Sequence, residues 1–333
     1  MTGPRLDLAL AGGGLTLPDT GRIVVLAPRA GQDLSALPRE RVQVVTGFFP
    51  DFEAFRSAGH DCATAPAGPV AAVLVCLPRA KAMARALIAQ AAALTEGPVV
   101  IDGARVDGIE SILRDCRKRV DVSGPINKAH GKLFWFRGGD FADWSDTGPG
   151  PVAGGWITAP GVFSSDGVDP ASDLLATALP AGLSGRVVDL GAGWGYLSAR
   201  MAGLPGPTAL DLVEADHQAL DCARRNVTDP RAAFHWADAT TWRPAAPADA
   251  VVTNPPFHTS RAADPGLGRA FIRSAAAMLR PGGRIWLVAN RHLPYEAVLA
   301  EHFPGVEEIA GDARFKVLSG TVAAGRRPRD RVA

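Results

Sequence analysis

The chain has 333 residues, of which 47% are hydrophobic and 21% are charged, and its formal net charge is +1. The composition excludes a disordered chain, and the near-zero net charge gives no overall positive field to attract nucleic acid. The length predicts two domains, because a single hydrophobic core usually serves fewer residues than this. The N-terminal residues do not predict a signal peptide, and no apolar run approaches the roughly 20 residues of a membrane span. We therefore expect a soluble, cytoplasmic protein with no membrane contact. Its four cysteines are widely spaced without a C-x-x-C pair, which predicts free thiols and no bound metal.

The first half, which we assign to residues 1–150, alternates short apolar runs with helical segments. A helix is predicted at 79–94, and strands are predicted at 21–28, 41–47, 70–78 and 97–103. Residues 137–156 are rich in Gly, Pro and Asp and show no period, so the domain boundary is placed within them.

The second half, residues 151–333, repeats the alternation more regularly. Strands are predicted at 186–191, 209–215, 233–237, 248–254 and 284–290, and helices at 217–227 and 268–279. The sequence "RPGG" at 280–283 carries the Pro and Gly that typically end a helix. This spacing predicts an α/β fold with a mainly parallel sheet covered on both faces.

A glycine-rich turn follows the first strand of the second half, in "VVDLGAGWGYLSARMA" at 187–202. Asp189 ends the apolar run, and then come Gly191, Gly193 and Gly195. Glycines let the backbone turn tightly and let a ligand approach without interference from Cβ atoms. A turn that only needs glycine would leave the same pattern, so this loop alone does not establish a binding site.

The acids beside the loop indicate the charge of its ligand. The pattern is D-x-G-x-G-x-G rather than the dinucleotide G-x-G-x-x-G, whose helix N-terminus attracts a pyrophosphate. Asp189 at the strand end instead favours a ligand with a cationic end, and S-adenosylmethionine carries both an ammonium and a sulfonium. Glu214 lies 25 residues after Asp189, at the end of the next strand, a spacing that suits a carboxylate binding a ribose diol.

The segment "TNPPFHTS" at 253–260 is the second strong signal. Two prolines end the predicted strand, because neither can donate to a ladder hydrogen bond, and they hold the backbone beside Asn254 rigidly. Asp238 follows the intervening strand. Because the carboxyl ends of parallel strands meet at one edge of a sheet, we expect Asp189, Glu214, Asp238 and Asn254 to surround one ligand.

With these residues in place, the chain resembles the class I S-adenosylmethionine-dependent methyltransferases, in which N-P-P-[FYW] marks enzymes that methylate an amino nitrogen conjugated to a π system. "NPPFH", together with "APGVFSSDGVDPASDLL" at 159–175, is similar to the bacterial ribosomal RNA guanine-N2 methyltransferases, the C type of the small subunit and the G type of the large subunit. The segments at 103–113 and 131–138 resemble that family's first domain. The resemblance implies two tandem Rossmann-like class I methyltransferase domains, the first degenerate and the second with a seven-stranded sheet.

The resemblance also implies the roles of individual residues. Asn254 and Pro255 would each present an oxygen, from the side-chain amide and the backbone carbonyl, to the two N–H bonds of the target amine. Pro255 and Pro256 would hold that carbonyl still, and Phe257 would stack on the base, so that positioning supplies much of the rate without a metal. The implied cofactor contacts are the loop glycines around the methionine part, Glu214 on the ribose, Asp238 on the adenine amino group, and Phe163 and Asp169 nearby.

The sequence leaves two interpretations open for several residues. His258 either contacts RNA or substrate phosphate, or bonds a backbone carbonyl of its own loop, and Trp194 either shields the cofactor or only packs. The basic tail at 325–333 is expected to be flexible and to touch RNA phosphates. A basic stretch in the first half either contacts RNA beside the aromatic segment 133–136 or is an ordinary solvated face. It comprises Arg114, Arg117, Lys118, Arg119, Lys128, Lys132 and Arg137.

The first half lacks the catalytic motifs. No D-x-G-x-G follows its first strand, and "VCLPR" at 75–79 supplies one proline and no Asn where N-P-P-F would stand. We therefore expect residues 1–150 to support the catalytic half and to help recognise RNA.

The predicted activity is methyl transfer from S-adenosylmethionine to N2 of a guanine in ribosomal RNA or a ribosomal subunit, with 16S RNA favoured over 23S. One alternative is the same chemistry on adenine N6 of nucleic acid or on a protein glutamine, because those families also carry N-P-P-[YF]. Another is a non-enzymatic RNA-binding assembly module. The degenerate first half and His258 argue against the other methylation targets. The non-enzymatic module is disfavoured because the site residues are intact: Asp189, Glu214, Asp238 and Asn254.

Overall fold

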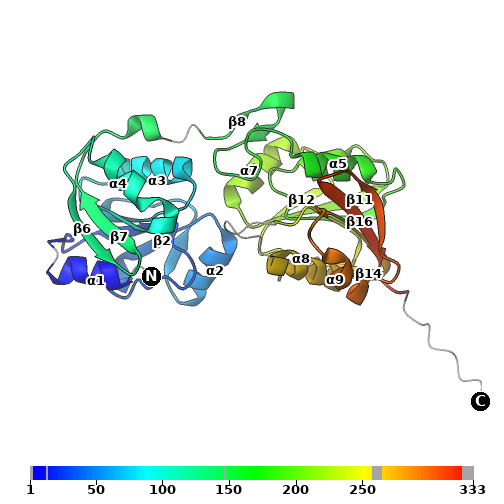
Figure 1. Ribbon diagram of the computed structural model, residues 1–333, viewed down its shortest axis with the longest axis horizontal. Coiled ribbons are helices and arrows are strands. Elements are labelled where there is room, and N and C mark those ends of the chain that lie inside the picture. Colours follow the sequence, from blue (N-terminus) through cyan, green and yellow to red (C-terminus); the bar gives the residue numbers. More distant parts are fainter. Residues whose placement is uncertain (1–2, 13, 146–147, 257–264, 325–333) are drawn as a thin grey trace, which may run out of the picture. The chain divides into compact units, whose positions relative to one another are not determined.

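The computed structural model describes residues 3–12, 14–145, 148–256 and 265–324 (Figure 1). The chain divides into two compact units, Met1–Gly148 and Pro149–Ala333. Among the described residues, no helix combines the length and apolarity needed to cross a membrane. All four cysteines are free thiols, and only Cys62 is not fully buried.

The first unit is built on a seven-stranded sheet with the order β3-β2-β1-β4-β5-β7-β6. Its neighbouring strands are parallel except where β7 pairs with β5 and β6. The strands are β1 Arg22–Leu26, β2 Val42–Val45, β3 Asp61–Ala63, β4 Val70–Cys76, β5 Val99–Ala104, β6 Ser123–Lys128 and β7 Gly131–Phe136. The helices are α1 Gly3–Ala11, α2 Phe49–Ser57, α3 Lys81–Leu94 and α4 Ile109–Cys116, with short turns η1 Arg39–Arg41, η2 Arg105–Asp107 and η3 Ala142–Trp144.

The second unit is built on a sheet of the same design, β12-β11-β10-β13-β14-β16-β15, in which only β16 runs antiparallel to its neighbours. The strands are β10 Gly185–Leu190, β11 Pro207–Glu214, β12 Ala232–Trp236, β13 Ala248–Thr253, β14 Leu279–Asn290, β15 Glu307–Gly311 and β16 Phe315–Thr321. The helices are α5 Pro170–Ala178, α6 Tyr196–Ala202, α7 His217–Asn226, α8 Pro265–Met278 and α9 Tyr295–His302. Before them lie the two-stranded sheet of β8 Gly150–Pro151 and β9 Ile157–Thr158 and the turn η4 Ala153–Gly155.

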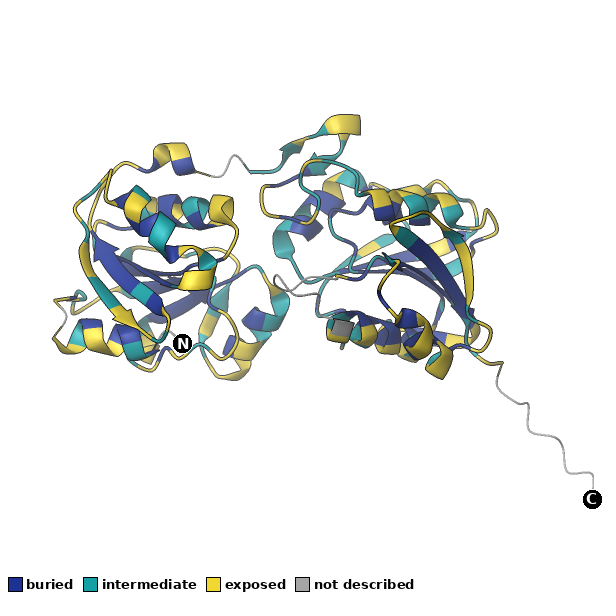
Figure 2. Cartoon of the chain, in the orientation of Figure 1, coloured by how far each residue is buried: buried dark blue, intermediate teal, exposed yellow. Residues whose placement is uncertain are grey.

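Helices cover both faces of each sheet, so the central strands are almost entirely buried (Figure 2). In the first unit, α1 and α2 pack on one face, and α3 and α4 pack on the other. In the second unit, α5, α6 and α7 cover one face, and α8 and α9 cover the opposite one. This burial on two faces explains why the parallel strands are continuous apolar runs rather than alternating ones.

The predicted α/β class and tandem arrangement are confirmed, and the likeness of the two sheets is closer than the sequence indicated. Both have the same strand order and the same single reversed strand. Sequence analysis predicted β1, β2, β4 and β5 of the first sheet. The edge strands β3 and β6 contain no fully buried residue and carry no apolar run, and the buried strand β7 was noted only as an aromatic segment.

The start of β14 differs most from its prediction. Helix α8 ends at Met278, close to the predicted stop at "RPGG", but β14 begins at Leu279 and includes that segment, five residues before the predicted strand. Leu279 pairs with Ala248, after which the register shifts before Arg284 pairs with Ala250. The shift has a local cause, because Pro281 donates no ladder hydrogen bond and Gly282 has a φ of 77°.

Candidate active site

Four loops of the second unit open at the carboxyl edge of its sheet. The parallel neighbours β10, β11, β12 and β13 end close to one another: Leu190 pairs with Val213, and Glu214 pairs with Trp236. Ligands bind at this edge in parallel sheets with crossover helices. The structure brings four predicted polar residues to it: Asp189, Glu214, Asp238 and Asn254.

The glycine loop turns through the left-handed region of φ. Gly191, Gly193 and Gly195 have φ angles of 80°, 55° and 90°, which other residues rarely adopt. A Cβ atom at Gly195 would stand 3.1 Å from Ala223, whereas one at Gly193 would meet no atom within 4 Å. Gly195 therefore lets the loop pack against α7, while Gly193 faces open space that a ligand can fill.

Glu214 holds the glycine loop through its carboxylate. Oε2 accepts a hydrogen bond from the N–H of Gly193 and Oε1 accepts one from the N–H of Asp216, both at 2.8 Å. Burial raises the pKa of Glu214, and these two backbone donors oppose the rise. Because a carboxylate offers about four lone-pair sites, both oxygens keep capacity for ribose hydroxyls.

Asp238 lies two residues beyond β12 in a tight turn. Its Oδ1 accepts hydrogen bonds from the N–H and the hydroxyl of Thr240, at 2.8 and 2.7 Å. The side chain is half-buried, and its Oδ2 bonds to none of the residues that the structure describes. The turn therefore fixes one oxygen and leaves the other as an acceptor at the sheet edge.

Asp189 is the most enclosed of the acids, with 1% of its surface exposed. Oδ2 accepts a hydrogen bond from the Ser198 hydroxyl at 2.6 Å, while Oδ1 is buried without a partner in the described part of the chain. Burial raises the pKa of this carboxyl to about 7, although the bond from Ser198 lowers it. A buried acceptor without a donor costs about 1–3 kcal/mol, so its place beside the glycine loop indicates a ligand that donates there.

Asn254 begins the loop after β13, and its amide is bonded on one side only. Nδ2 donates to Asp169 Oδ2 at 3.0 Å and to Ser172 Oγ at 2.9 Å. Oδ1 is buried and has no partner in the described residues. Asp169 is the N-cap of α5, and its hydrogen bond to the Asn254 side chain places it against the loop after β13.

The structure describes the N-P-P-F segment as far as Pro256. Pro255 is buried and Pro256 is exposed. The Thr253 hydroxyl donates to the carbonyl of Leu190 at 2.6 Å, which ties the end of β13 to the end of β10. Phe257 and His258 lie outside the described residues, as does the tail at 325–333, so their predicted contacts stay predictions.

An aromatic cluster joins the segment before α5 to the glycine loop. Trp194 is 3% exposed, and its ring centroid lies 5.6 Å from that of Trp156 and 5.8 Å from that of Tyr196. Its Nε1–H donates to the carbonyl of Phe163 at 3.1 Å. Of the two interpretations of Trp194, its burial supports packing. Phe163 itself is 62% exposed, which leaves its ring free for a ligand.

Two serines of the site were missed by sequence analysis. Ser172 bonds the Asn254 amide, and Ser198 bonds Asp189. The first had a local signal, because Asp169 followed by Pro170 is a typical N-cap and first helical residue, which places Ser172 in the first turn. Ser198 had no signal of its own beyond its place three residues after the last loop glycine, Gly195.

The first unit keeps the turn of the glycine loop but not its chemistry. Ala27 occupies the place of Gly191: its φ is 52°, and its N–H donates to the carbonyl of Val45 at 2.8 Å, as the N–H of Gly191 does to Val213 at 2.9 Å. The strand registers of the two sheets also match other positions. Val25 takes the place of Asp189, Thr46 that of Glu214, and Cys76 that of Asn254. This edge therefore lacks the two carboxylates and the amide of the second unit.

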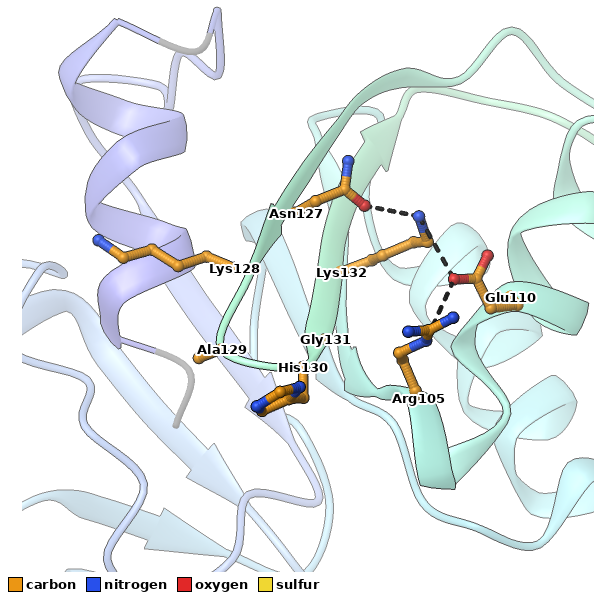
Figure 3. Close-up of a pocket in the computed structure, with 8 residues that line it drawn as sticks. All are labelled: Arg105, Glu110, Asn127, Lys128, Ala129, His130, Gly131 and Lys132. Atoms are coloured by element: carbon orange, nitrogen blue, oxygen red, sulfur yellow. Dashed lines mark hydrogen bonds and ion pairs between the residues drawn. The ribbon is translucent and has the colours of Figure 1, made fainter.

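The basic stretch of the first unit is partly neutralised by acids. Arg119 pairs with Asp143 at 2.6 Å. In a pocket beside the β6–β7 turn, Arg105 and Lys132 both approach Glu110, at 4.0 and 3.4 Å, and Lys128 points away from that group (Figure 3). The stretch is thus not one continuous cationic face, and RNA contact there stays a prediction.

Known proteins resemble this chain over most of its length. Residues 155–319 match the Methyltransferase small domain family. The ribosomal RNA large subunit methyltransferase G of Streptomyces avermitilis is 30% identical over 334 residues, which cover 90% of this chain and 87% of that protein. The ribosomal RNA small subunit methyltransferase C of Shewanella pealeana is 30% identical over 262 residues, which cover 74% of this chain and 76% of the relative.

A solved structure extends the likeness to both units. The T. thermophilus 16S rRNA N2 G1207 methyltransferase (RsmC), in complex with AdoMet and guanosine, matches with a TM-score of 0.77 and 26% identity, over 96% of this chain and 92% of that one. With two relatives at 30% identity over most of their length, the chain belongs to the S-adenosylmethionine-dependent ribosomal RNA methyltransferase family that comprises methyltransferases C and G.

Proposed function

We propose that this methyltransferase transfers the methyl group of S-adenosylmethionine to the exocyclic N2 amine of a guanine in ribosomal RNA, and that this RNA is the small-subunit 16S RNA. The observation that carries the proposal is the Asn254 amide, whose oxygen is a buried, unpaired acceptor at the same sheet edge as the glycine loop, among the residues that the structure describes. An amine supplies the N–H donors that such an acceptor requires, whereas a carbonyl does not. Guanine and 16S RNA are supported by the similar RsmC complex, because that protein is a 16S rRNA methyltransferase and its structure contains guanosine.

The residues at the sheet edge fit the cofactor. Asp189 Oδ1 is an orphaned buried acceptor suited to an ammonium, and Gly193 leaves open space beside it. In the proposed assignment, Gly191, Gly193 and Gly195 line the methionine part, Glu214 binds the ribose and Asp238 accepts from the adenine amino group. Phe163 lies beside the loop with its ring exposed. When bound, S-adenosylmethionine supplies an electrophilic methyl group on its sulfonium.

The chain's own residues orient the amine for attack. An exocyclic amine is a poor nucleophile because its lone pair is delocalised into the ring. Asn254 Oδ1 accepts one N–H and the Pro255 carbonyl accepts the other, which draws the nitrogen towards tetrahedral geometry. The two prolines hold the backbone still, so these acceptors need little reorganisation in the transition state. Phe257 stacks on the base and His258 contacts the substrate in this proposal, and the methylated amine loses its proton to water.

The first unit acts as support and as an RNA-recognition surface in this proposal, because its sheet edge lacks the acids and the amide of the second unit. The partner is ribosomal RNA or a ribosomal subunit. Since ribosomal RNA is made and assembled in the bacterial cytoplasm, the enzyme is assigned to that compartment.

Cofactor affinity is expected to rise with pH through about 7, the pKa to which burial raises the Asp189 carboxyl. An ammonium binds the ionised carboxylate, so the affinity falls by up to about tenfold for each pH unit below that pKa. The same raised pKa makes the ligand-free protein less stable as the pH rises from the unfolded value, 3.8, to about 7. Calorimetry with S-adenosylhomocysteine, which retains the ammonium, between pH 6 and 8 measures the effect. The Asp189→Asn variant should bind weakly with a flat profile, and a flat profile in the wild type would contradict the assignment.

Methylation of isolated RNA and particles tests the proposed function directly. The protein is incubated with labelled S-adenosylmethionine and naked ribosomal RNA, 30S particles or 50S particles; the RNA is then digested to nucleosides and any protein to peptides, and both are analysed by mass spectrometry. N2-methylguanosine is expected, in 16S RNA. N6-methyladenosine or methylated glutamine would replace the proposal by its alternative, and no product on any substrate would refute it.

A further inference from the structure

We infer that Asp169 is a positioning residue, which selects the orientation of the Asn254 amide so that its oxygen and not its nitrogen faces the substrate, and that Ser172 strengthens the hold on that amide. The inference rests on the proposed function and adds to it the groups that make Asn254 an acceptor. Asp169 is predicted to lie near the cofactor, and the structure places its carboxylate on the Asn254 amide.

The two ends of an amide are nearly equal in size and differ in hydrogen bonding, so the neighbours decide which end faces where. Here Nδ2 donates one hydrogen to Asp169 Oδ2 and the other to Ser172 Oγ, at 3.0 and 2.9 Å. With the amide reversed, the Asn254 oxygen would stand against a carboxylate oxygen, and two acceptors repel. The carboxylate therefore selects the orientation. A serine hydroxyl both donates and accepts, so Ser172 stabilises either orientation and selects neither.

Asp169 is itself held rigidly. It is the N-cap of α5, where its Oδ2 also accepts the N–H of Ser172 at 2.8 Å. Pro170 follows at the first helical position, which restricts the backbone there. One helix start thus supplies both partners of the amide, and the N-terminal end of α5 favours the negative charge that the selection needs.

The consequence is an acceptor prepared before substrate arrives. Asn254 Oδ1 is buried and unpaired in the described residues, so it carries a desolvation cost that an N–H from the substrate removes. A reversed amide would present NH₂ to the target amine, and donor would then face donor. Selectivity for an amine at this position depends, in this account, on a carboxylate that never touches the substrate.

The Asp169→Ser variant tests the inference without removing the helix cap. Ser caps helices about as well as Asp, so α5 and the unfolding midpoint should be unchanged. The new hydroxyl oxygen can accept the Ser172 N–H, but a hydroxyl both donates and accepts, so it no longer selects one orientation of the Asn254 amide. We expect kcat to fall by about 10- to 100-fold, up to the scale of a misplaced catalytic group, with KM for RNA within about threefold. Affinity for S-adenosylhomocysteine should match the wild type.

Three comparisons separate positioning from other roles. Ser172→Ala removes one of the two acceptors but keeps the carboxylate, so its loss of kcat should be smaller, and Ser172→Thr should restore the rate. Asp312→Ser is the matched control: like Asp169, Asp312 accepts backbone N–H bonds through its side chain, here two on Oδ1 at 2.7 Å each, and it lies in the turn before β16. That control should keep the wild-type rate.

The side-chain NH₂ of Asn254, observed by NMR and assigned through its loss in Asn254→Ala, gives a readout independent of activity. Its protons should exchange slowly with water in the wild type and quickly in Asp169→Ser. Unchanged kcat or unchanged exchange in Asp169→Ser would overturn the inference, and a loss confined to cofactor affinity would show that Asp169 is a cofactor-binding residue instead. If the wild type methylates no RNA, the proposed function fails, and the NMR result alone decides the orientation of the amide.

Discussion

Replacing Asn254 with alanine is expected to slow methyl transfer by about 10²–10³-fold, while affinity for the cofactor stays within about tenfold of the wild type. The variant removes a side-chain acceptor that is buried and unpaired in the described residues, at the same sheet edge as the glycine loop. The target amine then keeps its lone pair in the ring, because a single backbone carbonyl cannot orient both of its N–H bonds. Single-turnover rates at saturating cofactor, together with calorimetry using S-adenosylhomocysteine, measure the two effects separately.

Two variants sharpen this test. Asn254→Asp keeps the shape but places a second carboxylate against Asp169, so it should also lose the rate, by charge repulsion rather than by truncation. Asn290→Ala is the matched control, because Asn290 is an asparagine at the end of the neighbouring strand β14, whereas the amide bonded to Asp169 is that of Asn254. A large loss of cofactor affinity in Asn254→Ala, with kcat retained at saturation, would make Asn254 a cofactor ligand and contradict the proposed mechanism.

The sequence was informative where one residue type is required by backbone geometry or by a repeated pattern. The loop glycines have positive φ angles, so their spacing is visible in the sequence. The parallel strands are buried on both faces and are recognisable as apolar runs. The order of the loops after parallel strands then brought Asp189 and Asn254 to the same edge without any knowledge of side-chain contacts.

The sequence gives no signal where a role is made by a partner far along the chain. Asn254 and Asp169 are 85 residues apart, and their hydrogen bond decides which end of the amide is free. Sequence analysis named both residues but assigned Asp169 to the cofactor. The N-cap role of Asp169 is visible in the local sequence, whereas its hydrogen bond with the distant Asn254 is not. The same holds for Ser198, which matters only because its hydroxyl reaches Asp189.

The N-terminal helix is one of the elements that sequence analysis missed. Of the apolar residues of helix α1, Leu6 and Ala9 are buried in the core, whereas Leu8 is exposed. Its other anchor is Arg5, a residue type that a pattern search assigns to the surface. Arg5 is 3% exposed and Asp102, at β5, is 1% exposed. A buried pair 97 residues apart leaves no periodic signal.

Replacing Arg5 with leucine is expected to destabilise the first unit by about 3–5 kcal/mol, the range for removing one partner of a buried ion pair. Arg5 Nε and Nη2 donate to the two oxygens of Asp102 at 2.5 and 3.0 Å. Its Nη1 donates to the carbonyls of Lys128 and Ala129, at 3.0 and 3.5 Å, in the β6–β7 turn. The variant leaves a carboxylate and two carbonyls without these donors, while the leucine side chain supplies only apolar contacts.

Urea unfolding combined with hydrogen exchange by mass spectrometry measures and localises this loss. Amides of β5 and β7 should exchange faster, and those of β10 and β13 in the other unit should be unchanged, because free energies of local opening follow the elements that are weakened. The double variant Arg5→Leu/Asp102→Leu removes both charges, so it should recover part of the loss, and only part, because the carbonyls of Lys128 and Ala129 stay unpaired. Arg56→Leu, which breaks an exposed pair with Glu53, should leave the unfolding midpoint unchanged. An unchanged unfolding midpoint in Arg5→Leu would contradict the prediction. It would show that water or a neighbouring donor replaces the hydrogen bonds of Arg5 to the Asp102 carboxylate, and that α1 does not stabilise the end of strand β5 through this pair.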